Sequence, residues 1–354
     1  MATATTSIAQ QCSAAKRAAR SLARLDSAVK NAALEAIAVA LQARSHEILA
    51  ANERDMQAAR EAAIGDALLD RLRLDDARIA AIARAVREIA ALGDPVGELI
   101  DGQRLPNGLD VRRVRVPLGV VAVVYEARPN VTIDAAALCL KSGNAIVLRG
   151  SSSAAHSNAA LAAIAGEAAS AAGLPDGCVT LLAGGGREQL AELATLTDTV
   201  DLIIPRGGKG LKAALQAVAT VPVIYAASGN CHVYVDAGAD LDQAEAIVIN
   251  AKTQRPGVCN AAETLLVHRA LAAEFIPRVL RSLGAAGVLV RGDERTQALA
   301  ASLADDSDGD GDRAAGGPRF ATVEPAAEED WESEYLAPVL ALGVVDSLEQ
   351  AIEH

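Results

Sequence analysis

A cysteine in the second half of the chain stands in a context that suits a reactive thiol. Cys259 directly follows Pro256-Gly257-Val258 and precedes an apolar run at residues 264–267. A Pro-Gly turn ahead of a strand predicts that this thiol lies on a loop. Arg255 and Lys252 stand close in sequence and would lower the pKa of the thiol, which favours the nucleophilic thiolate. The alternative is a packing residue, since cysteine is among the most buried residue types, and spacing alone leaves both open.

The other four cysteines give weaker signals. Cys12, Cys139 and Cys178 stand in Ala-rich or strand-like contexts and are expected to be packing residues. Cys231 is adjacent to His232, but neighbours on a strand point to opposite faces, which weakens a catalytic pair. Five cysteines without a CxxC pair favour free thiols in a reducing, cytoplasmic compartment over a disulfide framework.

The neighbourhood of Cys259 lacks an evident general base. The sequence has no carboxylate between Asp201 and Asp236, and only five histidines in all. A hydrolase needs a group that activates water. The composition of this region therefore favours acyl transfer or reduction at the thiol over hydrolysis.

Three turns could hold phosphate groups. They are Gly184-Gly185-Gly186, Gly207-Gly208-x-Gly210 and Arg149-Gly150-Ser151-Ser152-Ser153. Each follows an expected strand and precedes an expected helix, where backbone N–H groups bind phosphates. Ordinary strand-to-helix turn chemistry explains each one slightly better than phosphate binding when it is taken alone.

The elements that must position these residues change character along the chain. The first hundred residues repeat apolar side chains at helical spacing. A turn at Pro106-Asn107-Gly108 and alternation over residues 109–116 predict a hairpin arm with one solvent-exposed face, a candidate for subunit contacts.

Short apolar runs then alternate with Ala-rich helices, and a second alternating unit begins near residue 233. The rhythm predicts an α/β fold with a doubly wound, mainly parallel sheet. The expected strands are residues 119–124, 145–148, 179–182, 201–204 and 221–224, and the expected helices between them are residues 133–141 and 154–172.

Composition excludes several classes of partner. The 354 residues include 33 Lys and Arg against 45 Asp and Glu, a net charge of −12, and only 2% are aromatic. This balance argues against nucleic acid and anionic membranes as partners. No apolar stretch has the length and continuity of a membrane span. Residues 305–318 begin like a calcium loop but have Gly317 where a bidentate Glu is needed, so no metal site is expected.

Several segments together resemble the aldehyde dehydrogenase superfamily, and within it the branch that reduces glutamyl 5-phosphate to glutamate 5-semialdehyde in proline biosynthesis. The resemblance runs over essentially the whole chain. The segments that carry it are YEARPNVT (125–132), IPRGGK (204–209), GNCHVYVD (229–236), the block 254–268 containing RPGVCNA, and Asp330-Trp331 with Glu334-Tyr335-Leu336.

The resemblance implies a Rossmann-type nucleotide-binding domain (residues 1–97 and 117–232), a hairpin oligomerisation arm (98–116) and an α/β catalytic domain (233–354). It implies NADPH as hydride donor and a thioester intermediate on the nucleophile, Cys259. Asn130 and the Cys259 backbone N–H would stabilise the oxyanion. The cofactor would contact Arg149, Ser151, Gly207, Gly208 and Glu334. Arg128 and Arg255 are suggested for the glutamate α-groups by their charge and proximity in sequence. A homo-oligomer, and glutamate 5-kinase as a transient partner, are also implied.

Three departures bear on these expectations. Hydrolytic superfamily members place a Glu base near Ala227, and this sequence has Ala227-Ser228-Gly229. Close relatives place a Lys after the glycines that follow Arg149, where this chain has serines, so preference for NADPH over NADH stays open. The sequence ends at His354, some sixty residues before the family's usual end, so a C-terminal part is expected to be missing. The alternatives are another acylating aldehyde dehydrogenase, using CoA or phosphate, and an inactive nucleotide-binding module.

Overall fold

The computed structural model describes residues 7–183, 185–225, 229–307 and 320–354. The chain divides into two compact units, unit 1 (Met1–Ala226) and unit 2 (Ala227–His354). Sequence analysis placed this boundary between residues 232 and 233. Each unit has its own sheet and its own hydrophobic core.

Unit 1 begins with helices, as the apolar spacing predicts. Leu34, Ile37 and Leu41 recur at three- and four-residue spacing and are buried. At three of the five helices a side chain at the N-cap satisfies an otherwise unpaired backbone N–H group, for example the Asp26 carboxylate, which accepts from the N–H of Val29. The five helices are α1 (Ile8–Leu22), α2 (Ser27–Ala43), α3 (Ser45–Glu61), α4 (Asp66–Leu72) and α5 (Asp76–Ala91).

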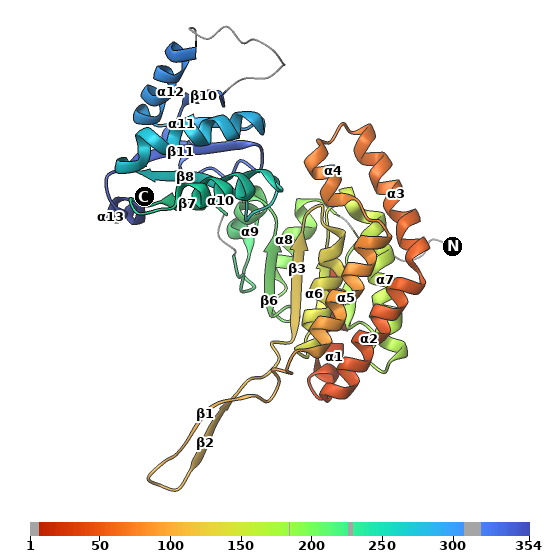
Figure 1. The fold of residues 1–354 in the computed structure, drawn as a ribbon. Coiled ribbons are helices and arrows are strands. Elements are labelled where there is room, and N and C mark those ends of the chain that lie inside the picture. Colours follow the sequence, from red (N-terminus) through yellow and green to blue (C-terminus); the bar gives the residue numbers. More distant parts are fainter. Residues whose placement is uncertain (1–6, 184, 226–228, 308–319) are drawn as a thin grey trace. The chain divides into compact units, whose positions relative to one another are not determined.

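The sheet of unit 1 has four parallel strands in the order β5-β4-β3-β6, with helices packed against it (Figure 1). Every residue of β3 is buried, because helices cover both faces of a doubly wound sheet. The predicted parallel α/β architecture is confirmed. The strands are β3 (Val120–Tyr125), β4 (Ala145–Arg149), β5 (Val179–Leu181) and β6 (Leu202–Arg206), and the helices between and after them are α6 (Pro129–Lys141), α7 (Ala155–Ala171), α8 (Arg187–Thr195) and α9 (Lys209–Val218).

The strand order reverses between β3 and β6, because the chain runs outward from β3 through β4 and β5 and then returns to the other side. Ligands of such sheets bind at this reversal, beyond the carboxyl ends of the strands. The expected strand at residues 221–224 is wrong: only an isolated bridge joins Val223 to Ile203. Pro222 has no N–H to donate and so cannot extend the ladder.

A hairpin formed by β1 (Leu99–Arg104) and β2 (Asp110–Val114) extends from unit 1 as an arm (Figure 1). The expectation of one solvent-exposed face does not hold within this chain, since every residue of both strands is exposed. Apolar side chains on the arm therefore contact water here. They include Leu99, Ile100, Val111 and Val114.

Unit 2 contains a five-stranded parallel sheet in the order β10-β9-β11-β8-β7 (Figure 1). β8 and β11 lie inside the sheet and are almost wholly buried, which matches their apolar sequences. No helix among the described residues is long and apolar enough to cross a membrane. The elements are β7 (Cys231–Val235), α10 (Leu241–Thr253), β8 (Ala262–His268), α11 (Arg269–Ala285), β9 (Leu289–Gly292), α12 (Glu294–Ser307), β10 (Val323–Pro325), β11 (Val339–Val345) and α13 (Leu348–Glu353).

Candidate active site

Cys259 lies in a turn between the end of α10 and the start of β8, and its side chain is exposed. Two backbone hydrogen bonds shape this turn, from Val258 N–H to the Arg255 carbonyl and from Ala261 N–H to the Val258 carbonyl. Gly229 packs directly against it: a Cβ atom on Gly229 would lie 2.3 Å from the Cys259 carbonyl oxygen. The sequence thus places an accessible thiol on a loop that backbone contacts hold in place.

The remaining cysteines do not match this environment. Cys12, Cys139 and Cys178 are buried, and burial raises the pKa of Cys12 and Cys178 to about 11 and that of Cys139 to about 12. Cys231 is half-buried and its thiol lies 3.3 Å from the Cys259 carbonyl oxygen. Its pKa is raised by burial first and then by the nearby Cys259. Among the five thiols, Cys259 is the one classed as exposed.

Lys252, which precedes the Cys259 turn in sequence, pairs with a carboxylate in the structure. Its ammonium donates to the Glu263 carboxylate at 2.6 Å and to the Ala262 carbonyl oxygen at 2.9 Å. Both charged side chains have 0% exposure. Burial lowers the pKa of Lys252, and the carboxylate beside it opposes that change. The lysine charge is therefore compensated inside unit 2 by Glu263.

Glu334 lies in the segment that leads into β11, and its side chain is half-buried. Its charge contributes to raising the pKa of Cys231, the thiol that donates to the Cys259 carbonyl oxygen. The Asn230 amide donates to the Trp331 carbonyl oxygen at 2.5 Å, and the Leu336 N–H donates to Glu263 at 3.2 Å. Sequence reasoning missed the structural roles of Asn230 and Glu263.

In unit 1, the loops after β3, β4 and β6 meet at the strand reversal. The Glu126 carboxylate accepts the N–H of Gly208 at 3.0 Å, at the start of α9. The Ala127 N–H donates to the Ser151 hydroxyl at 3.1 Å. A Cβ atom on Gly207 would lie 2.7 Å from the Glu126 carboxyl carbon, so a larger residue here would displace the Glu126 side chain. Sequence reasoning did not assign Glu126, although it follows the strand at the position where ligands bind in such sheets.

Arg149 ends β4 and reaches the loop after β5. One guanidinium nitrogen donates to the carbonyl oxygens of Gly185 and Gly186, at 2.5 and 3.0 Å. Its Nε is buried and finds no hydrogen-bond partner among the described residues. Burial lowers the pKa of Arg149. A partly desolvated guanidinium with an unsatisfied donor is well suited to an anionic ligand. Gly184, in the same candidate turn, lies outside the described residues.

Asn130 occupies the first turn of α6 and is exposed. Its amide donates to the Asp134 carboxylate at 2.9 Å. Arg128, at the N-cap of the same helix, is half-buried. Arg255 belongs to unit 2 and is exposed on the Cys259 turn. The candidates thus form two groups: Arg128, Asn130, Arg149, Ser151, Gly207 and Gly208 in unit 1, and Arg255, Cys259 and Glu334 in unit 2.

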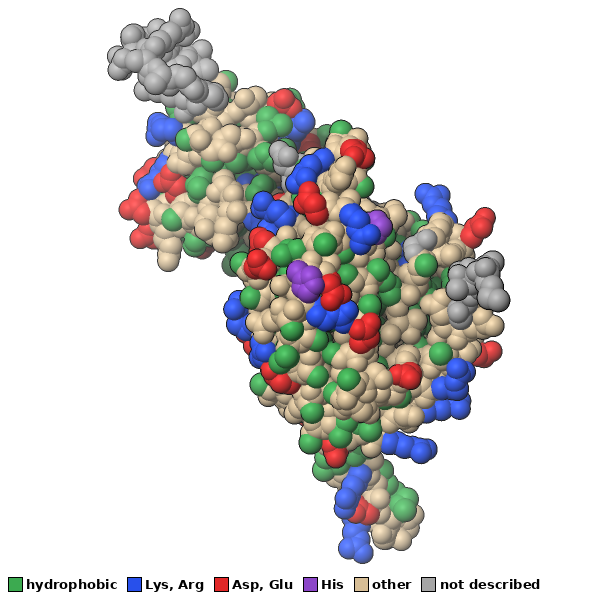
Figure 2. All heavy atoms as spheres, turned by 90° about the vertical axis from the view of Figure 1, so that its right-hand side faces the viewer, with side chains coloured by type: hydrophobic (Ala, Val, Ile, Leu, Met, Phe, Trp, Pro, Cys, Tyr) green, Lys and Arg blue, Asp and Glu red, His purple; other side chains and the backbone are tan. Residues whose placement is uncertain are grey.

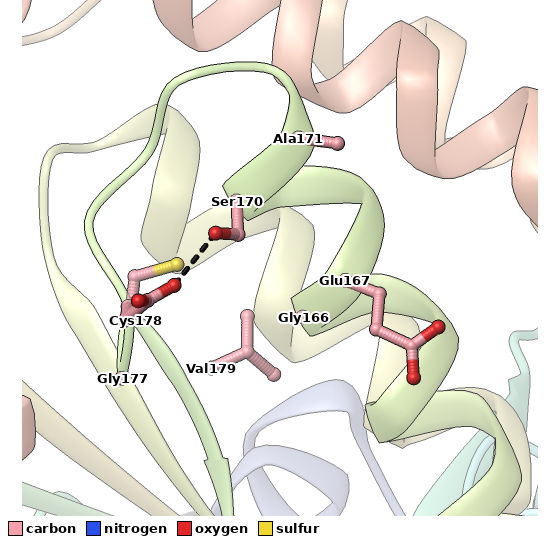
Figure 3. A pocket seen from close by; sticks show the side chains of 8 residues that line it. Gly166, Glu167, Ser170, Ala171, Gly177, Cys178 and Val179 are labelled. Atoms are coloured by element: carbon pink, nitrogen blue, oxygen red, sulfur yellow. Dashed lines mark hydrogen bonds between the residues drawn. The ribbon is translucent and has the colours of Figure 1, made fainter.

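A cavity of about 450 Å³ in unit 1 lies elsewhere, between α7 and the start of β5 (Figure 3). It is lined by Glu167, Asp176 and Cys178 among others, and the Ser170 hydroxyl donates to Asp176 at 2.6 Å. This is the amino end of the strands, opposite to the end where such sheets bind ligands. The cavity therefore does not belong to the candidate site.

Comparison with known proteins identifies the fold family. The sequence pattern of the aldehyde dehydrogenase family matches residues 1–302. The chain belongs to the aldehyde dehydrogenase family. It is 52% identical over 340 residues to a γ-glutamyl phosphate reductase of Moorella thermoacetica, and 50% identical to one of Thermobifida fusca. Both matches cover 96% of this chain and 77% of the relative.

Solved structures agree with this family assignment. The crystal structure of γ-glutamyl phosphate reductase from Thermotoga maritima is similar with a TM-score of 0.86 at 41% identity, over 97% of this chain and 78% of that one. An acetylating aldehyde dehydrogenase from Geobacillus thermoglucosidasius shares the fold at 22% identity, with a TM-score of 0.65. The predicted aldehyde dehydrogenase-like α/β fold is confirmed.

Membership in the aldehyde dehydrogenase family makes this chain an oxidoreductase that acts on an aldehyde and uses a nicotinamide nucleotide. The expectation about a missing Glu base near Ala227 lies outside the described residues, as do residues 308–319 of the acidic segment. Among the described residues no cluster of His, Cys, Asp or Glu is arranged to hold a metal ion.

On the face shown in Figure 2, Lys and Arg side chains are interspersed with Asp and Glu. On the arm, three exposed arginines pair with carboxylates: Arg112 with Asp110, Arg113 with Asp101 and Arg115 with Glu98. Mixed charges of this kind do not form the positive stripe that binds a phosphate backbone.

Proposed function

We propose that this chain catalyses the NADPH-dependent reduction of L-glutamyl 5-phosphate to L-glutamate 5-semialdehyde, with release of phosphate, in proline biosynthesis. The identity of 50–52% to γ-glutamyl phosphate reductases over nearly the whole chain supports this activity. The observation that carries the chemistry is Cys259, an exposed thiol on a turn held by Gly229.

The proposed reaction has two steps at the Cys259 sulfur. The thiolate attacks the γ-carbonyl carbon of the acyl phosphate, the C–O bond to phosphate breaks, and a thioester remains. When bound, the nicotinamide supplies a hydride to the thioester carbon. The resulting thiohemiacetal oxyanion collapses, the C–S bond breaks, and the semialdehyde leaves while Cys259 returns to a thiolate. Glu263, the acidic residue closest in sequence, is buried and paired with Lys252, so it is not free to activate water against the thioester.

The residues of unit 1 fit a nicotinamide nucleotide. Gly207 and Gly208 lie at the start of α9, where Gly207 closely approaches the Glu126 side chain, and backbone N–H groups at a helix start bind pyrophosphate. We propose that these glycines hold the cofactor, that Glu334 holds its nicotinamide ribose, and that Arg149 with Ser151 binds the 2′-phosphate of NADP.

Replacing Arg149 by alanine is expected to weaken NADPH binding by about 10- to 100-fold, because a charge-assisted hydrogen bond contributes about 1.5–3 kcal/mol. NADH lacks the 2′-phosphate, so its binding should change much less. Fluorescence titration of both nucleotides measures the two dissociation constants. Arg20→Ala, an exposed arginine in the last turn of α1, is the control. Equal losses for both nucleotides would contradict 2′-phosphate recognition.

The acyl acceptor distinguishes the proposed function from its nearest alternative. In the reverse direction, reduction of NADP by glutamate 5-semialdehyde should require inorganic phosphate, since phosphate must cleave the thioester. CoA should not replace it. Measuring NADPH formation with phosphate, with CoA and with neither checks this directly. Turnover with CoA alone would instead indicate another acylating aldehyde dehydrogenase, and nucleotide binding without any turnover would indicate a binding module.

The remaining proposals follow from the same assignment. Arg128 and Arg255 are proposed to bind the α-carboxylate of the substrate. The exposed apolar side chains of the β1–β2 arm support a homo-oligomer. Glutamate 5-kinase is proposed as a transient partner, because the acyl phosphate is labile. A cytoplasmic location is proposed from the five free thiols.

A further inference from the structure

Unit 2, which carries the candidate residues Arg255, Cys259 and Glu334, also contains a buried ion pair. Lys252 and Glu263 are the one ion pair among the described residues in which both side chains have 0% exposure. Taking two charges out of water is costly, and replacing such a pair by apolar residues is often neutral or stabilising. The pair is therefore not explained by stability alone, and its contacts indicate a different role.

The first set of contacts fixes the two ends of the Cys259 turn. Lys252 stands in the last turn of α10, just before the turn begins. Glu263 is the second residue of β8, just after the turn ends. The Lys252 ammonium joins these ends by donating to the Glu263 carboxylate and to the Ala262 carbonyl oxygen. The pair thus clamps the base of the loop that carries Cys259.

The second set of contacts holds the backbone before and after Glu334. The other oxygen of Glu263 accepts the N–H of Leu336, two residues after Glu334. Leu336 has φ of 51°, a left-handed conformation that is unfavourable for a residue with a side chain and must be held by its surroundings. Three residues before Glu334, the Trp331 carbonyl oxygen accepts from Asn230.

The Asn230 side chain is itself held by a residue of β8. Its side-chain oxygen accepts the hydroxyl of Thr264, which is buried next to Glu263 in β8. One short stretch of β8 therefore holds the segment around Glu334 on both sides, and holds the Cys259 turn through Lys252. A displacement of β8 or a loss of the pair would move both groups.

We propose that Lys252, Glu263 and Asn230 are positioning residues that hold the Cys259 turn and the Glu334 segment in one fixed arrangement. Glu263 connects the two, because one of its oxygens binds Lys252 and the other binds the backbone beyond Glu334. The inference rests on the proposed roles of Cys259 and Glu334. None of the three residues is proposed to touch substrate or cofactor.

The test separates positioning from stability with paired variants. Lys252→Met alone and Glu263→Gln alone each leave a buried charge without its partner, so both should lower Tm. The double variant K252M/E263M removes both charges and should recover most of the Tm. It should nevertheless lose kcat/KM on the order of 10²-fold, because a displacement of about 1 Å is sufficient for such a loss. K252M/E263Q keeps an acceptor for the Leu336 N–H and should recover part of that activity.

Two further measurements test the positions of the Cys259 turn and the Glu334 segment separately. The rate at which iodoacetamide alkylates Cys259, followed by peptide mass across pH, reports the thiol's environment without substrate or cofactor and should change several-fold in K252M/E263M. Asn230→Ala, at a half-buried site, should raise the KM for the nucleotide and leave this alkylation rate unchanged. If the double variant does not fold, the measurements on Asn230→Ala still test the proposal.

A folded K252M/E263M protein with wild-type kcat, KM and alkylation profile would overturn the proposal, and so would an unchanged nucleotide KM in Asn230→Ala. Failure of the proposed function appears elsewhere, as turnover that persists in Cys259→Ala. The two failures are therefore distinguishable.

Discussion

Replacing Cys259 by alanine is expected to lower kcat on the order of 10⁴-fold or more, because no covalent intermediate can form without the nucleophile. The side chain is exposed, so the free energy of unfolding should change by no more than about 0.5 kcal/mol. Phosphate-dependent formation of NADPH from the semialdehyde measures the loss. Thermal unfolding verifies that the variant is folded.

Two matched variants define the outcome. Cys259→Ser retains a side chain of similar shape but with a hydroxyl, which is barely ionised at neutral pH, and should be nearly as inactive as the alanine variant. Cys231→Ala removes the neighbouring thiol, which is half-buried and has a raised pKa, and should retain most of the turnover. Full activity in Cys259→Ala together with inactivity in Cys231→Ala would transfer the nucleophile assignment to Cys231.

Local patterns along the sequence predicted most of the fold. Helical spacing of apolar residues identified the N-terminal helices, and runs such as that of β3, apolar on both faces, indicated a parallel sheet covered on both sides. The prediction failed at residues 221–224, where the apolar pattern suggested a strand. The apolar pattern of a sequence indicates which residues can be buried. Strand pairing also requires backbone N–H donors, and Pro222 lacks one.

The site was predicted less completely, because charge in sequence does not show which partner a side chain finds in space. Lys252 stands seven positions before Cys259, and its sequence context suggested an effect on the thiol. In the structure its partner is Glu263, on the far side of the turn. Glu126 shows the same limit, since its contact with Gly208 joins residues that are 82 positions apart. The contact of Glu126 with Gly208 forms only because β3 and β6 become neighbours in the folded sheet.

Replacing Asn130 by alanine is expected to lower kcat by about 10²- to 10³-fold, which corresponds to the 2.7–4 kcal/mol that one oxyanion donor contributes. An amide nitrogen carries two N–H groups. One donates to the Asp134 carboxylate at 2.9 Å and so fixes the orientation of the amide, which leaves the second for the oxyanion. Because Asn130 is exposed, Tm should stay close to that of the wild type.

Variants of the same pair test whether orientation and charge act as this account requires. Asn130→Asp replaces the amide by a carboxylate of the same shape, which would repel the oxyanion, so it should be less active than Asn130→Ala. Asp134→Asn keeps the Asn130 donors but removes the charged acceptor that orients them, and should give a smaller loss. Burial raises the pKa of Asp134 and the hydrogen bond from Asn130 opposes this, so that carboxylate depends on the amide as well. A carboxylate at position 130 with wild-type kcat would exclude Asn130 as an oxyanion donor, because no negative group can stabilise a developing negative charge.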